Sequence, residues 1–302
     1  ADGSQMYVQK ETSLPVGAVQ IGWFENPHDP NVPYERNVKF ELMTPKALLE
    51  DQEEPLNPET RVGEKRFHLE VARVEEFLEK HEGWQERKER MPLAFFDGTL
   101  LVSFSLPQTQ LQQSFLSAML KLVVKSKETR VPLVGYIDRS FAKDIVTMIG
   151  ILEPAFGETT LYDATLLSSR TSNTERLLEK WGDRTAFCHA KRKGLEIFID
   201  DTTRTALVGF SYILATADSP PTRLDIPTWI YEAGLLGELI DVVRAECVVG
   251  LGYPYVLETA DATALISNRD REVFISVLRD FASREGLDFS VSRKSASKAR
   301  RR

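Results

Sequence analysis

The sequence predicts an α/β protein in which helices pack on a sheet of mixed strand direction. Two apolar runs, at residues 93–102 and 131–138, have the composition of buried strands, and each is followed by a helical pattern. Several strand candidates then follow one another between residues 185 and 226, before helical patterns return. This succession suits one mixed sheet with helices packed on it.

The remaining elements are expected where the hydrophobic spacing changes along the chain. Further strands are expected at residues 18–24, 38–43, 185–189, 195–199, 204–216 and 222–226. Helices are expected at residues 60–90, 111–126, 141–152, 229–247, 255–266 and 271–284. Ser140 is a candidate N-cap for the third of these helices.

The composition is that of an ordinary globular protein, with 42% hydrophobic and 27% charged residues. No apolar run approaches the roughly 20 residues that span a bilayer. The two cysteines form no CxxC pair, so we expect a reduced, cytoplasmic protein. The four histidines lack metal-ligand spacing, which disfavours zinc. Any metal would be held by carboxylates, which suits Mn²⁺ or Mg²⁺.

The net charge of −7 argues against a protein that is basic all over, but it does not exclude a local basic groove. Lys191 and Arg192 belong to a basic cluster that could bind nucleic-acid phosphates. A second cluster lies in the C-terminal tail, between Arg293 and Arg302. The alternative for this tail is a solvated, disordered end.

Acidic residues interrupt three apolar segments of the sequence. These residues are Asp97, Asp138 and Asp163, and Asp144 follows the second by about one helical turn. Two-metal cleavage of phosphodiesters needs such a group, because carboxylates hold divalent ions roughly 3.5–4 Å apart. The alternative is that acids at strand ends cap neighbouring helices.

Asp97 needs an explanation of its own, because a charge inside a buried strand is costly unless it is paired or bound to a metal. One interpretation is a metal-binding aspartate on the central strand of a nuclease-type sheet. The other is a hairpin turn, since Asp97-Gly98 is also a strong turn signal. The other acids favour the first interpretation, because a turn would need no such companions.

The sequence resembles the NurA nuclease family through an ordered set of motifs between about residues 90 and 267. They are Phe96-Asp97-Gly98-Thr99, Gly135-Tyr136-Ile137-Asp138-Arg139-Ser140, Leu161-Tyr162-Asp163, Thr222-Arg223-Leu224-Asp225-Ile226-Pro227-Thr228-Trp229 and Gly252-Tyr253-Pro254-Tyr255-Val256-Leu257-Glu258-Thr259-Ala260-Asp261. The resemblance implies an α/β fold with an RNase H-like mixed sheet flanked by helices, an N-terminal extension and a C-terminal helical part. It also implies a Mn²⁺-dependent DNA nuclease that forms homodimers and works with the hexameric ATPase HerA in DNA end resection and repair.

The resemblance also assigns roles to the acids. Asp97 and Asp163 match metal-binding aspartates of the family. A second carboxylate lies between them in the family, and Asp144 is our choice for it, with Asp138 as the alternative. The tyrosine important for activity in the family would correspond to Tyr212. Many members carry a histidine where this chain has Asp261, so this residue could bind metal but could not act as an imidazole base.

Arg139 and Arg223 are candidates for contacts with DNA phosphates. Their alternative role is a salt bridge with a neighbouring acid, Asp138 or Asp225 respectively.

We predict three parts of the chain. Residues 1–90 form an N-terminal extension that could contact a second copy or a partner, residues 91–285 form the nuclease domain, and residues 286–302 form a flexible basic tail. Expected partners are single-stranded and duplex DNA ends, HerA and a second copy, with no membrane. Asp261 and the acidic net charge motivate an alternative, a catalytically weak or inactive relative that binds DNA or docks HerA. A further alternative is an RNase H-like enzyme that acts on RNA hybrids.

Overall fold

A computed structural model describes residues 1–7, 15–49, 57–104, 109–154, 159–168, 177–216 and 219–287. The chain forms two compact units, one of residues 1–70 together with 259–302 and the other of residues 71–258. Helix α2 (Pro58–Lys80) begins in the first unit and ends in the second. Helix α8 (Tyr255–Ala264) begins in the second unit and ends in the first. No helix in the described ranges is long and apolar enough to cross a membrane.

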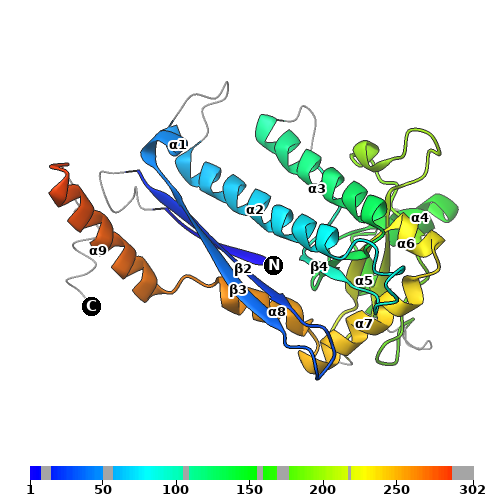
Figure 1. The fold of residues 1–302 in the computed structure, drawn as a ribbon. Coiled ribbons are helices and arrows are strands. Elements are labelled where there is room, and N and C mark those ends of the chain that lie inside the picture. Colours follow the sequence, from blue (N-terminus) through cyan, green and yellow to red (C-terminus); the bar gives the residue numbers. More distant parts are fainter. Residues whose placement is uncertain are drawn as a thin grey trace. The chain divides into compact units, whose positions relative to one another are not determined.

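The first unit contains an antiparallel sheet of three strands in the order β1-β2-β3. Its strands are β1 (Asp2–Tyr7), β2 (Gly17–Glu25) and β3 (Glu35–Met43), and β2 and β3 run side by side in Figure 1. The short helix α1 (Pro45–Leu49) follows β3 and adds Leu48 to an apolar core with Val19 and Ile21 of β2. Helix α9 (Asn268–Arg284) begins with a capping box made by Ser267 and Asp270.

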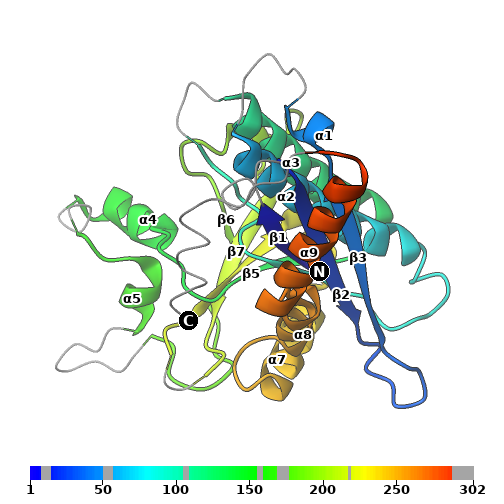
Figure 2. The same ribbon diagram turned by 90° about the vertical axis from the view of Figure 1, so that its left-hand side faces the viewer.

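The second unit contains the sheet that the sequence predicts. Its five strands lie in the order β4-β5-β8-β7-β6. They are β4 (Ala94–Asp97), β5 (Leu133–Ile137), β6 (Cys188–His189), β7 (Val208–Ile213) and β8 (Thr222–Pro227). β4 and β5 pair in parallel, and the other neighbours pair antiparallel. The predicted α/β class with a mixed sheet is therefore confirmed, and Figure 2 shows β5, β6 and β7 beside α4 and α5.

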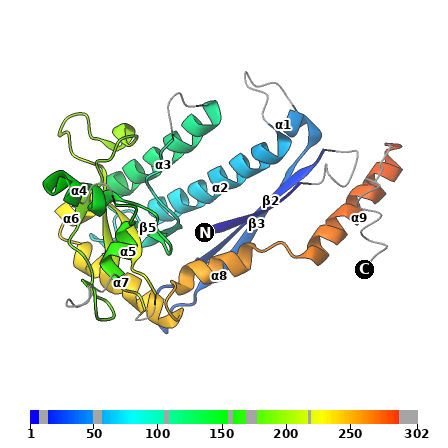
Figure 3. The same ribbon diagram turned by 180° about the vertical axis from the view of Figure 1, so that it is seen from behind.

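Helices flank this sheet. They are α3 (Gln110–Thr129), α4 (Asp144–Leu152), α5 (Asp163–Ser168), α6 (Thr228–Glu232) and α7 (Leu236–Val249). Ion pairs of 2.8 Å between Lys121 and Glu75 and of 2.9 Å between Lys125 and Glu79 join α3 to the second half of α2, and the two helices lie side by side in Figure 3. The indole of Trp229 donates a hydrogen bond of 3.2 Å to Ser126 and so links α6 to α3.

Strand β4 is shorter than the predicted run 93–102 and lies at the edge of the sheet, so the expectation of a central strand was wrong. The chain leaves the strand direction at Gly98, whose φ of 124° suits a residue without a side chain. The following segment then approaches Gly135 of β5 closely. A Cβ atom at Gly135 would lie 2.7 Å from the carbonyl oxygen of Gly98. The small residue in β5 therefore lets this segment pack over the strand.

Three other local predictions were wrong. Helix α4 begins at Asp144 after Lys143, and Ser140 does not cap it. Residues 195–199 form no strand but contain the 3₁₀ helix η2 (Glu196–Phe198). The predicted helix 229–247 is divided into α6 and α7, because Gly234 adopts a φ of 74° that ends the first helix.

Strand β1 was not predicted, since its polar start hides the alternating pattern. The predicted basic tail lies almost entirely outside the described residues, which end at residue 287.

Candidate active site

Asp97 is the last residue of β4 and is exposed, whereas Phe96 before it is buried. The expectation of a charge buried within the strand was therefore wrong. The Tyr253 hydroxyl donates a hydrogen bond of 2.9 Å to Oδ1 of Asp97. The Tyr253 ring packs edge-on against Tyr136 of β5, with 5.3 Å between ring centroids. Because β4 pairs in parallel with β5, Asp97 and the glycine after it do not form a hairpin turn.

Asp163 begins helix α5 and is fully buried. Its Oδ1 accepts a hydrogen bond of 3.0 Å from the backbone N–H of Val146, and its Oδ2 accepts one of 3.0 Å from the hydroxyl of Tyr212. Burial raises the pKa of the Asp163 carboxyl, and the negative charge of Asp144 raises it further. The hydrogen bonds only partly oppose this rise. Burial also raises the pKa of the Tyr212 hydroxyl, to about 12, so Tyr212 remains a donor at neutral pH.

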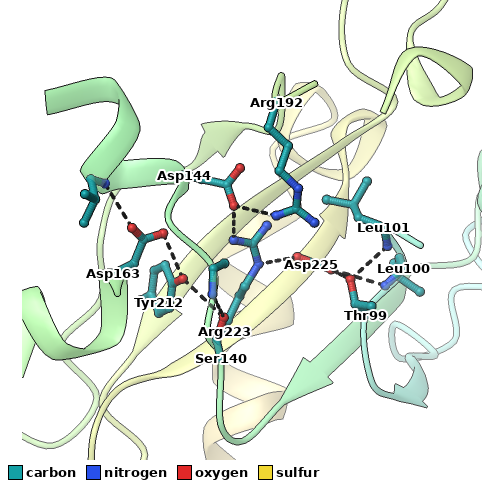
Figure 4. A network of polar contacts seen from close by, with 12 residues as sticks. Thr99, Leu100, Leu101, Ser140, Asp144, Asp163, Arg192, Tyr212, Arg223 and Asp225 are labelled. Atoms are coloured by element: carbon teal, nitrogen blue, oxygen red, sulfur yellow. Dashed lines mark hydrogen bonds and ion pairs between the residues drawn. The ribbon is translucent and has the colours of Figure 1, made fainter. Parts of the chain in front are cut away.

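Asp144 begins helix α4 and is also buried. Its charge is balanced by Arg223 of β8, whose Nη1 donates a bond of 2.6 Å to Oδ2 of Asp144. The same guanidinium donates through Nε to Oδ1 of Asp225, at 2.7 Å, and lies 4.2 Å from the ring centroid of Phe210. Burial alone would lower the pKa of Arg223, but Asp225 and Asp144 outweigh it and raise this pKa. Arg223 is therefore a permanent cation between two carboxylates (Figure 4).

Asp225 connects this ion pair to the segment after β4. Its Oδ2 accepts hydrogen bonds from the Thr99 hydroxyl, at 2.6 Å, and from the backbone N–H of Leu100, at 3.2 Å. Arg223 and Asp225 are two residues apart on one strand, so their side chains share a face of the sheet. From the sequence, Asp225 was expected only as a possible salt-bridge partner of Arg223, and its spacing of two residues from Arg223 was the signal that could have indicated a larger role.

A second arginine binds the same oxygen of Asp144. Nη1 of Arg192 donates a bond of 3.0 Å to Oδ2 of Asp144. Figure 4 shows both guanidinium groups converging on this carboxylate, Arg223 from strand β8 and Arg192 from the irregular segment after β6. The side chain of Arg192 is 36% exposed, whereas that of Arg223 is 3% exposed. The two arginines therefore differ in how firmly the fold holds them.

The family model of the NurA domain matches residues 1–266. The chain belongs to the NurA family. The crystal structure of the NurA nuclease from Sulfolobus solfataricus is similar to this chain with a TM-score of 0.59 and 15% sequence identity, over 94% of this chain and 83% of that one. A search of curated proteins gave no match. The NurA match includes residues 1–90, so the N-terminal part belongs to the family region.

The other residues predicted from the sequence, except Arg223, are exposed. Arg139 and Asp138 are exposed and form a long ion pair of 4.0 Å with each other, which is the alternative role considered for Arg139. Lys191 is exposed beside Arg192. Asp261 is exposed on the part of α8 that belongs to the first unit. For Arg223 the alternative role is also the observed one, since its side chain is buried in ion pairs.

The expected NurA metal does not fit the residues as they are arranged here. Among the described residues, no group of three or more His, Cys, Asp or Glu side chains could hold a metal ion. Oδ2 of Asp144 already accepts from two guanidinium groups, and both oxygens of Asp163 accept hydrogen bonds. Arg192 and Arg223 already supply the positive charge beside Asp144 that a metal ion would otherwise supply.

Proposed function

We propose that this member of the NurA family is a metal-dependent nuclease that cleaves DNA, with Mn²⁺ or Mg²⁺ as its cofactor. The match of the NurA family over residues 1–266 is the observation that carries this proposal. The NurA nuclease of Sulfolobus solfataricus supports it through a shared fold. The buried Asp163 adds a second argument, because a carboxyl with a raised pKa beside another acid is typical of a functional site.

The proposed catalytic residues are Asp97, Asp144 and Asp163, with Asp138 as the alternative to Asp144. Three side chains hold them in place. Tyr253 donates to Asp97, Arg223 to Asp144 and Tyr212 to Asp163. The exposed cations Arg139 and Lys191 are proposed to contact DNA phosphates, since both side chains reach solvent.

The wider proposals follow from the family rather than from the site. We propose that the protein is cytoplasmic and works as a homodimer with a HerA-type ATPase in DNA end resection and recombinational repair. Its substrates would be single-stranded DNA and duplex ends. We also propose that the exposed Asp261, where many relatives carry a histidine, contributes to cleavage.

An assay of DNA cleavage tests the proposal. Wild-type protein and the Asp97→Ala variant would be incubated with single-stranded DNA, duplex DNA and an RNA–DNA hybrid, in Mn²⁺ and in EDTA, with and without a HerA-type ATPase. We expect Mn²⁺-dependent cleavage of DNA by the wild type and background cleavage by Asp97→Ala. Asp201→Ala is the matched control, because Asp201 is also an exposed aspartate and has no proposed role in the site. Cleavage that survives in Asp97→Ala would contradict the site, and preference for the hybrid would contradict the substrate.

A second candidate is a DNA-binding or HerA-docking relative without catalysis. The observation that favours it is the absence of a three-acid metal group among the residues with described positions. Wild-type protein that binds DNA but cleaves none, even with the ATPase, would decide for this candidate.

A further inference from the structure

Phe141 and Tyr162 form an exposed aromatic pair next to the buried acids of the site. Their ring centroids lie 5.2 Å apart and the ring planes meet at 73°, so the rings pack edge-on. Phe141 is 72% exposed, more than any other described phenylalanine, and Tyr162 is 38% exposed. A single exposed apolar residue needs no explanation, but two exposed rings in contact form a small aromatic surface. Such a surface can bind a ligand that has a flat π-face.

The fold holds this aromatic pair beside the acids. Phe141 lies in the segment between β5 and α4, and Tyr162 directly precedes Asp163. The backbone N–H of Asp163 donates a hydrogen bond of 2.9 Å to the carbonyl oxygen of Ala142, which joins the two segments next to the rings. The bond of 3.0 Å from the N–H of Val146 to Oδ1 of Asp163 joins them again. A ligand on the rings would therefore lie beside the site.

A cation accompanies the aromatic pair. The ammonium group of Lys143 lies 5.5 Å from the ring centroid of Tyr162 and donates a long hydrogen bond of 3.5 Å to the carbonyl oxygen of Thr159. Lys143 is exposed, so it can bind an anion from solvent. Lysine is depleted from the centres of protein–protein interfaces, whereas basic side chains beside stacking rings are typical of proteins that bind single-stranded nucleic acid. The surface thus favours a nucleic-acid strand over a protein partner.

We propose that Phe141 stacks on an unpaired base of single-stranded DNA, while Tyr162 holds the Phe141 ring in place and Lys143 binds a phosphate of the same strand. This assignment rests on the proposed function and deepens it, because it names residues that would select unpaired DNA. Every base has a π-face, so the contact would not depend on sequence. A base inside an intact duplex must first be unstacked, which costs free energy. The aromatic pair would therefore favour single strands and frayed ends.

The test measures how much the bases contribute to binding, in EDTA so that no divalent cation takes part. Fluorescence anisotropy would give the Kd of the full chain for a labelled oligothymidine strand and for an abasic strand of the same length, which keeps the phosphates. The variants are Phe141→Leu, Tyr162→Leu and Lys143→Gln. Tyr231→Leu is the matched control, because Tyr231 is 50% exposed and stacks on Phe187 instead. Circular dichroism and sedimentation velocity would verify the fold and the mass of each variant.

We expect the wild type to bind the oligothymidine strand at least about fivefold more tightly than the abasic strand, the lower size of one base–aromatic stack. Phe141→Leu should lose this preference and keep its affinity for the abasic strand, and Tyr162→Leu should show a smaller preference. Lys143→Gln should weaken the binding of both strands by the same factor. Tyr231→Leu should behave as the wild type.

Three results would overturn the role of the aromatic pair. They are a wild type without preference for the strand with bases, a preference that survives in Phe141→Leu, and a lower sedimenting mass of Phe141→Leu, which would place a second copy on the rings. The proposed function is tested separately, by cleavage of the oligothymidine strand in Mn²⁺. Absence of cleavage by a wild type that shows the preference would overturn the nuclease and leave the base contact standing.

Discussion

Replacing Asp163 by Asn should stabilise the metal-free protein at neutral pH. Asp163 is fully buried and its pKa is raised by burial, so its ionised form is disfavoured in the folded chain. Asn has the same shape, and its amide oxygen can still accept from the backbone N–H of Val146. Its amide nitrogen can donate to the hydroxyl oxygen of Tyr212. Asp163→Asn therefore removes the charge without leaving the two neighbouring groups unpaired.

The expected size follows from the shift in pKa. Below the unfolded pKa of about 3.9, Asp163 is neutral in both states, and the folded protein has its full stability from this group. As the pH rises through the raised folded pKa, this stability is lost, by about 1.4 kcal/mol for each unit of the shift. Asp163→Asn should therefore raise the free energy of unfolding at pH 7 by about 1.4 kcal/mol for each unit of the pKa shift. Each kcal/mol should raise the melting midpoint by roughly 2–4 °C.

Thermal unfolding in EDTA, measured between pH 3 and pH 8 for wild type and Asp163→Asn, checks this expectation. The two curves should approach each other at the acidic end and separate as the pH rises. Asp138→Asn is the control, because Asp138 is exposed and should show no such separation. A variant that is less stable than wild type at pH 7, by the same amount at every pH, would refute the argument that the buried charge is costly.

Three further substitutions test the contacts around the site. Arg223→Ala should lower the free energy of unfolding by about 3–5 kcal/mol in urea denaturation, because it leaves buried carboxylates unpaired; a loss below 1 kcal/mol would contradict the ion network. Thr99→Val removes the hydroxyl that donates to Asp225 and should cost about 1–3 kcal/mol in the same measurement, and an unchanged midpoint would show that this bond is not formed. Tyr253→Phe should change stability by less than about 1 kcal/mol yet lower Mn²⁺-dependent cleavage, since it frees Asp97; full activity would show that Tyr253 does not position this carboxylate.

The sheet was predictable wherever apolar runs matched buried strands. Residues 131–138 contain β5 and residues 222–226 contain all of β8 but its last residue, and the side chains of both strands lie almost wholly in the core. Prediction failed where backbone geometry ended an element. Gly98 and Gly234 adopt positive φ angles that close β4 and α6, and composition alone does not reveal which glycine will do so. Strand β1 could not be predicted, because its pairing with β2 decides its conformation.

The sequence predicted which acids belong to the site, but it did not predict which side chains bind them. The acid positions follow from polar residues in apolar segments, which single sequences reveal. The partners lie far away along the chain, since Arg223 is 79 residues from Asp144 and Arg192 is 48 residues from it. Only the folded sheet brings β8 to the start of α4. Sequence reasoning could therefore offer metal binding and ion pairing for these acids without deciding between them.

The buried acids of the site differ in whether a neighbouring cation balances their charge. Asp144 and Asp225 are buried, and Arg223 lies between them with Arg192 as a second cation. These two carboxylates and two guanidinium groups cancel in charge. Asp163 is equally buried but, among the described residues, is held only by uncharged donors, and its pKa is raised. Asp163 is therefore the buried acid of this group whose charge no cation in the described network balances.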